Sequence, residues 1–98
     1  KRENMKNKIS EVQITPIKAR EGLVGFASFV YDNNFYFGSI GIYTRPTGGY
    51  RLTYPTRGNF NLFHPINRMI AEEIKKVIIS KFEDVTKMYA RHNKNISR

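Results

Sequence analysis

The spacing of apolar residues changes once along this 98-residue chain, close to Pro65. Before that point, short segments alternate polar residues with apolar or β-branched ones, which is the two-residue period of a half-buried strand. After it, apolar residues recur at steps of three and four, which describes one face of a helix. These residues are Ile66, Ile70, Ile74, Val77, Ile78, Phe82, Val85 and Tyr89. A run of strands followed by one helix predicts an α+β fold, an antiparallel β-meander of about four to five strands with one long C-terminal helix packed on the sheet.

Four segments, residues 11–17, 23–32, 35–44 and 50–54, have the composition of strands. Proline cannot donate to a ladder, so the first strand should end at Pro16 or lie at a sheet edge. The pair Asn33-Asn34 predicts a two-residue hairpin turn, because asparagine tolerates positive φ. Residues 55–61 are expected to form a loop.

The helix should begin at Asn67, a suitable N-cap, and Glu72 and Glu73 should lie early enough to favour the helix dipole. We expect it to fray after Tyr89. The predicted organisation is a flexible extension over residues 1–8, a single domain over 9–89, and a basic tail over 90–98.

The second predicted strand is apolar on both faces, and one helix can cover only one side of a sheet. One face carries Val24, Phe26 and Val30, and the other carries Leu23, Ala27, Phe29 and Tyr31. The uncovered face predicts a homodimer, with a platform for stacked bases as the alternative. Nine of the thirteen aromatic residues lie between positions 26 and 54. We expect them to pack in the core and a dimer interface, and the candidates for base stacking are Tyr36, Tyr43, Tyr50 and Tyr54.

The chain carries 17 Lys and Arg against 8 Asp and Glu, a formal net charge of +9, and no acid occurs between Asp32 and Glu72. Such an imbalance attracts polyanions, although surface charge also serves solubility alone. Six residues are candidate nucleic-acid contacts: Arg51, Arg57, Arg68, Lys75, Lys76 and Lys81. The alternatives are a cross-strand structural role for Arg51, solvated positions for Arg57 and Arg68, and the polar side of an amphipathic helix for the lysines. Lys87, Arg91, Lys94 and Arg98 suit nonspecific electrostatic attachment.

The residues for an enzyme are lacking in the sequence. The sequence contains no cysteine, and neither His64 nor His92 has a neighbouring nucleophile or a metal-ligand spacing. No glycine motif for phosphate binding is present. We expect His64 to make a structural hydrogen bond near the helix start. No catalytic residue, cofactor, metal or small-molecule substrate is predicted. No apolar run approaches the roughly 20 residues that span a bilayer, which predicts a cytoplasmic protein without membrane attachment.

Several segments together resemble the SpoVG septation-regulator family (stage V sporulation protein G). They are Ala27–Val30 through Ile40-Gly41-Ile42, then Gly49–Arg57, then His64-Pro65-Ile66-Asn67 before a long helix. The resemblance covers residues 9–85, with Thr56 where the family has a lysine and no match at Phe60 to the family's loop arginine. It implies a bacterial homodimer with a meander-plus-helix fold that binds DNA, or RNA in some members, and regulates septation, sporulation and gene expression.

Two functions from different classes follow from these observations. The first is a dimeric nucleic-acid-binding regulator whose basic loop, helix and tail neutralise phosphates. The alternative is a protein-interaction adaptor in cell-division control, in which the charge only keeps the dimer soluble. Attachment to a membrane surface ranks last, because no apolar helix face remains for insertion.

Overall fold

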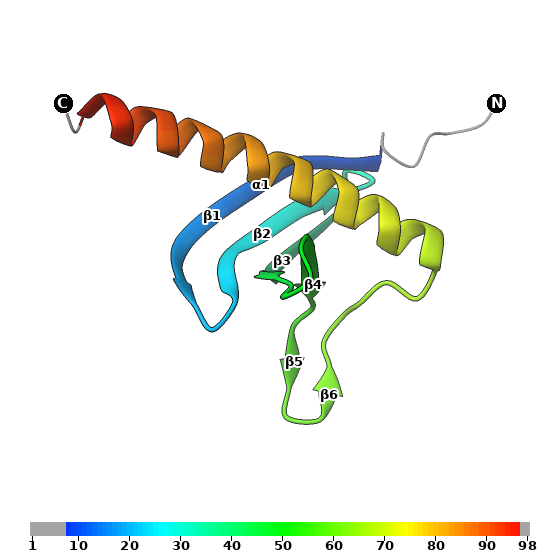
Figure 1. The fold of residues 1–98 in the computed structure, drawn as a ribbon. Helices are drawn as coiled ribbons and strands as arrows, with labels where there is room; N and C mark the ends of the chain where they lie inside the picture. Colours follow the sequence, from blue (N-terminus) through cyan, green and yellow to red (C-terminus); the bar gives the residue numbers. More distant parts are fainter. Residues whose placement is uncertain (1–7, 97–98) are drawn as a thin grey trace.

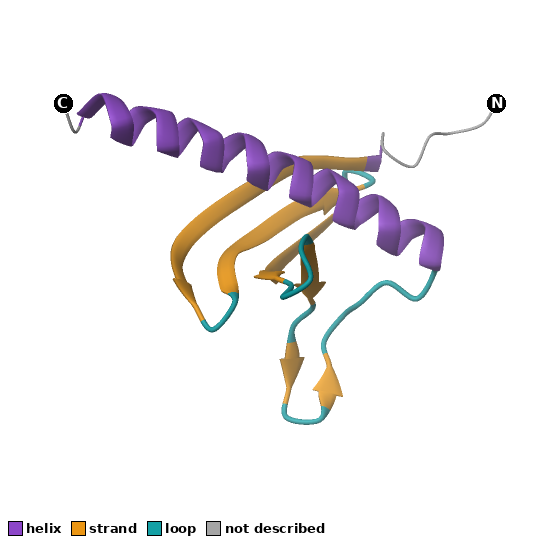
Figure 2. Ribbon diagram, in the orientation of Figure 1, coloured by secondary structure: helices purple, strands orange, loops and turns teal. Residues whose placement is uncertain are grey.

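The computed structural model describes residues 8–96, with side chains described for residues 8–88. Six strands precede one helix, which lies across the larger of two sheets (Figures 1 and 2). The elements are β1 (Ile9–Arg20), β2 (Leu23–Tyr31), β3 (Phe35–Thr44), β4 (Tyr50–Thr53), β5 (Thr56–Arg57), β6 (Phe60–Asn61) and α1 (Arg68–Ile96). The predicted α+β class is confirmed. Within the described residues, no helix contains an apolar stretch long enough to cross a membrane.

The larger sheet is an antiparallel meander in the order β1-β2-β3-β4, so β1 and β4 are its edges. β1 continues through Pro16, which pairs with Gly25, as far as Arg20. The expected edge position of Pro16 is therefore confirmed, and the strand does not end there. An edge strand tolerates proline because only one of its sides carries a ladder.

The β2–β3 turn contains three residues, Asp32–Asn34, instead of the predicted two, because Tyr31 pairs with Phe35. Asp32 and Asn33 adopt φ of 55° and 58°, and the Asn34 amide donates to the Tyr31 carbonyl at 3.0 Å. Asn33 and Asn34 lie in the turn as predicted, and Asp32 joins them because aspartate tolerates positive φ as asparagine does.

Residues 55–61 also differ from the prediction of a loop. They contain a second, two-stranded sheet in which Thr56 pairs with Asn61 and Arg57 with Phe60. The polypeptide reverses at Gly58, whose φ is +61°. This β5–β6 hairpin projects away from the main sheet and the helix (Figure 1).

Asn67 caps the helix as predicted. Its side-chain oxygen accepts a hydrogen bond from the Ile70 amide at 3.1 Å, and its carbonyl accepts one from the Ala71 amide at 2.9 Å. α1 therefore begins at Arg68. Ile66 lies outside the helix and is 92% exposed, so its assignment to the buried face was wrong.

Two further helix predictions are corrected. The first turn of α1 contains no acid, because Glu72 and Glu73 fall in the second turn. The helix also continues to Ile96 instead of ending near Tyr89. Its backbone therefore includes the positions of Arg91 and Lys94, while Arg98 lies outside the described residues.

The core forms where the apolar face of α1 meets one face of the sheet. Ile40, Ile42 and Ile78 are completely buried. The other buried core residues are Ile9, Ala27, Phe29, Ile74 and Phe82. The apolar face of α1, predicted from the three-and-four spacing, therefore packs on the apolar face of the sheet that the alternation in β2 predicts. This contact fixes the helix over the sheet.

The uncovered face of the sheet is less aromatic than expected. Phe26 and Tyr36 are exposed there, but Gln13, Thr15 and Ser28 lie beside them. Most aromatic residues between positions 26 and 54 instead pack in or against the core, namely Phe29, Tyr31, Phe37, Tyr50 and Tyr54.

Candidate nucleic-acid interface

The acid-free interval of the sequence becomes one side of the molecule. β3, β4, β5, β6 and the connection to the helix all lie between Asp32 and Glu72, and they contain no acid. Since β4 is an edge of the sheet and the β5–β6 hairpin follows it directly, this side carries Arg45, Arg51 and Arg57, all of them exposed. We call it the arginine edge.

Arg51 is held against a neighbouring strand. It pairs with Tyr43 across β3 and β4, and its guanidinium carbon lies 4.5 Å from the centre of the Tyr43 ring. This cation–π contact gives Arg51 a cross-strand structural role. The side chain is nevertheless exposed, so its charge still contributes to the potential of the arginine edge.

Arg57 occupies a different kind of position. It lies in β5, opposite Phe60 in β6, and both side chains are exposed. Nothing lies within 4 Å of the position that a side chain on Gly58 would take, so the tip of the hairpin is open. A polyanion could approach this backbone closely.

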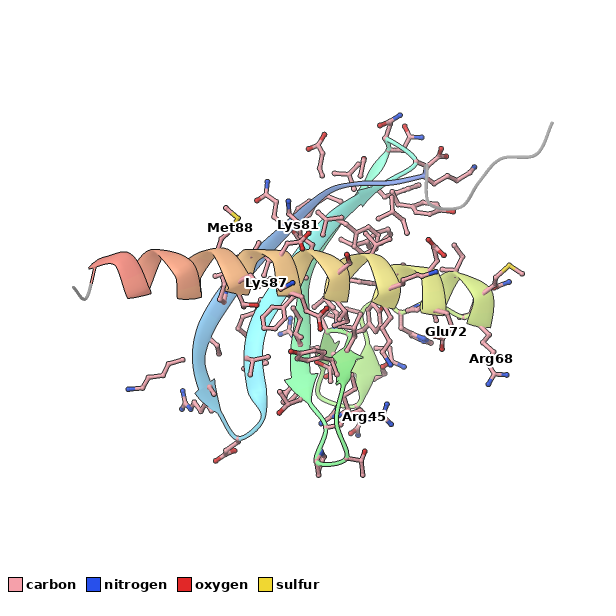
Figure 3. The ribbon with its side chains drawn as sticks, turned by 45° about the horizontal axis from the view of Figure 1, so that its top comes forward. Arg45, Arg68, Glu72, Lys81, Lys87 and Met88 are labelled. Atoms are coloured by element: carbon pink, nitrogen blue, oxygen red, sulfur yellow. The ribbon has the colours of Figure 1, made fainter. Side chains whose placement is uncertain are left out.

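Arg68 begins the helix, and its side chain projects from the helix end (Figure 3). Lys81 lies thirteen positions further along α1, a distance of about 20 Å along a helix. Figure 3 accordingly places Lys81 and Lys87 well along α1 from Arg68.

The helix lysines do not form a surface of one sign. Lys75 and Lys76 line a shallow hollow with Arg45 that also contains Glu72, Glu73 and Glu83. Lys76 and Lys81 line a second hollow with Asp84, between the helix and β1. The acids one helical turn away reduce the positive potential at these lysines.

The six predicted contact residues are therefore not gathered on one face of a single chain. Arg51 and Arg57 share the arginine edge, Arg68 stands at the start of α1, and the three lysines lie among acids on the helix. Residues 8–88 hold eleven Lys and Arg against seven Asp and Glu, so more than half of the net charge of +9 belongs to the remaining terminal positions.

Of the four tyrosines named as candidates for base stacking, only Tyr36 is largely exposed, with 72% of its surface in solvent. Tyr43 lies beneath Arg51, and Tyr50 packs edge-on against Phe82. The Tyr54 hydroxyl is buried.

An apolar hollow of about 600 Å³ lies between the sheet, residues 61–67 and the start of α1. The sequence did not reveal this hollow, because its wall combines residues of the strands, of the connection before α1 and of the helix, which are far apart in the sequence. Leu62 and Ile66 line it and remain exposed, while Phe37 and Phe63 close its inner wall with ring centres 4.9 Å apart.

The buried Tyr54 hydroxyl beside this hollow has no hydrogen-bond partner among the described residues. Its burial raises the pKa of Tyr54 from the ordinary value of 10.0 to about 12. The folded state therefore favours the neutral phenol, while the unfolded chain ionises near pH 10. The stability that this difference contributes is fully present below pH 10 and is lost as the pH rises from 10 to 12.

Tyr54→Phe should consequently lose less stability between pH 10 and 12 than the wild type does. At neutral pH its free energy of unfolding should be unchanged or higher, because it removes a buried hydroxyl without a partner. Urea denaturation at both pH values measures this. Tyr36→Phe, which removes an exposed hydroxyl, is the control. A clear loss of stability in Tyr54→Phe at neutral pH would show that the hydroxyl is bonded.

His64 makes a local contact, with its Nδ1 3.2 Å from the Pro65 carbonyl oxygen, and it is exposed. The expected structural contact near the helix start is present, although the cap itself is Asn67. Within the described part of the chain, no three His, Cys, Asp or Glu side chains are grouped to hold a metal ion.

Comparison of the chain with protein-family models and with curated protein sequences found no match.

Proposed function

We propose that this protein is a dimeric nucleic-acid-binding regulatory protein of the SpoVG type, acting on DNA or RNA in the cytoplasm and linked to septation, sporulation and gene-expression control. The observation that carries the proposal is the arginine edge, where exposed arginines project from an acid-free part of the fold. Phosphate groups bind guanidinium groups in bidentate geometry. The segments that carry these arginines contain no acid, and the acids that share a hollow with Arg45 belong to α1.

The family resemblance supports the same function. It predicts a β-meander followed by one long helix, and the fold has this form. The motif His64-Pro65-Ile66-Asn67 lies where the resemblance predicts it, directly before α1, and Asn67 caps that helix. Arg57 lies on the arginine edge, and the resemblance identifies it as the retained member of a basic pair whose lysine is replaced by Thr56.

A homodimer would cover exposed apolar surface of the single chain and would also duplicate its arginines. Phe35, Leu62 and Ile66 are 59%, 58% and 92% exposed, and the latter two line the apolar hollow. Covering this apolar surface with a second chain would remove it from water. Two-fold symmetry would also duplicate the arginine edge, so that a pair of chains presents more cations to a nucleic acid than one chain does.

The apolar hollow equally favours the adaptor in cell-division control, because a protein partner could insert apolar side chains there. The two functions differ in what the arginines do. An adaptor would retain its partner after the charge of Arg57 is reversed, whereas a nucleic-acid-binding protein would lose affinity.

Size-exclusion chromatography with light scattering tests the proposal. A short labelled duplex, or an RNA of the same sequence, should elute with the protein at the mass of two chains plus the nucleic acid. Elution of both nucleic acids at their free positions at low salt would contradict nucleic-acid binding. A complex containing a single chain would contradict the dimer.

A further inference from the structure

Phe60 is an aromatic residue that the fold leaves in solvent. It lies in β6 on the projecting β5–β6 hairpin, and 74% of its surface is exposed. It belongs neither to the buried core nor to the residues packed against the core. A phenyl ring in this position contributes little hydrophobic stabilisation to the folded chain.

The residues on either side of Phe60 are not apolar, and the nearest exposed apolar residue along the chain, Leu62, belongs to the apolar hollow. The neighbours Asn59 and Asn61 are polar and exposed, and Gly58 at the turn is open to solvent. A stable protein–protein interface needs a much larger continuous surface than one ring. The hairpin tip is better suited to a small flat group.

Arg57 is placed to act together with this ring. Arg57 and Phe60 are directly opposite each other in the two-stranded sheet. Side chains of such a pair project on the same side of the ribbon, with Cβ atoms roughly 4.5–5.5 Å apart. The hairpin thus presents one cation and one aromatic ring side by side, in the part of the chain that lacks acids.

We propose that Phe60 stacks on an unpaired base of single-stranded DNA or RNA while Arg57 binds an adjacent phosphate. This inference rests on the proposed nucleic-acid function and identifies the strand form that the hairpin recognises. The faces of bases are accessible in single strands, and each stacked base contributes to affinity independently of sequence. Insertion between paired bases would first require the duplex to unstack at a cost of a few kcal/mol.

The chain has no tryptophan, so Phe60→Trp provides a single tryptophan on the hairpin, which can be excited selectively over the six tyrosines. Its emission should be quenched to saturation by a single-stranded oligonucleotide and much less by the blunt duplex of the same sequence. Phe60→Ala should weaken single-strand binding by about 5- to 150-fold, which corresponds to the loss of one stacked base. Its duplex affinity should stay close to that of the wild type.

Two further variants separate stacking from general apolar contact. Phe60→Leu keeps an apolar side chain but no ring and should behave like Phe60→Ala. Met69→Ala truncates an exposed apolar residue that lies outside both the hairpin and the apolar hollow, and it should leave single-strand affinity unchanged.

The outcomes distinguish this inference from the proposed function. Salt-sensitive binding that leaves Phe60→Trp unquenched and Phe60→Ala at wild-type affinity would overturn the role of Phe60 and leave nucleic-acid binding intact. Equal losses for single strands and duplex in Phe60→Ala would overturn the selectivity for unpaired bases. Absence of binding to every probe at low salt would remove both proposals.

Discussion

Ile78→Ala should lower the free energy of unfolding by about 2–5 kcal/mol, a large part of the roughly 5–15 kcal/mol that stabilises a typical domain. Ile78 is completely buried on α1, in the same core cluster as Ile40 and Ile42 of β3. Removal of its side chain takes away apolar contacts with the sheet and leaves a cavity, because packed strands relax only partly. Urea denaturation followed by far-ultraviolet circular dichroism measures the change.

Met69→Ala is the matched control for this prediction. Met69 also belongs to α1, but 65% of its surface is exposed. Its truncation should change the free energy of unfolding by no more than about 0.5 kcal/mol. Similar losses in the two variants would mean that α1 is not fixed on the sheet through Ile78.

The double variant Arg57→Glu/Arg68→Glu should bind nucleic acid much more weakly and with less dependence on salt. If each arginine contacts one phosphate, the slope of log affinity against log salt should fall in magnitude by about 2. Both side chains are exposed, and an acid at position 68 in the first turn suits the helix dipole, so the fold should be retained. Fluorescence anisotropy over a series of salt concentrations measures the slope.

Lys18→Glu/Arg20→Glu gives the same change of net charge at another place. Both residues are exposed at the end of β1, the sheet edge opposite β4. This variant should retain more affinity than the Arg57 and Arg68 variant. Equal losses would show that binding depends on total charge and not on the proposed positions.

Much of the fold could be predicted from the sequence, because it depends on periodicity. Alternation in β2 and the three-and-four spacing from Ile70 to Phe82 each identify a buried face, and these two faces meet in the core. The β5–β6 hairpin could not be recognised in this way, because strands of two residues are too short to show a period. The local signal for it was the turn-forming pair Gly58-Asn59 between the paired residues Arg57 and Phe60. Ile66 continued the helical spacing by chance, and only its place before the Asn67 cap excludes it from the helix.

The candidate site was less predictable, since charge counts do not specify which side chains lie together. The contact of Arg51 with Tyr43 depends on the register of β3 with β4. The acids beside Lys76 and Lys81 become neighbours only through the helical turn and the approach of α1 to β1. The absence of acids between Asp32 and Glu72 could be read directly from the sequence. It did not reveal that α1 brings Glu72, Glu73 and Glu83 into one hollow with Arg45.

The salt dependence of wild-type binding tests nucleic-acid recognition most directly. With labelled DNA and RNA in anisotropy titrations, affinity should fall linearly on a double-logarithmic plot as salt rises, with a slope that reports the number of neutralised phosphates. An affinity that does not change with salt, or no binding of either nucleic acid at the lowest salt, would contradict the proposal that these cations exist to bind phosphate.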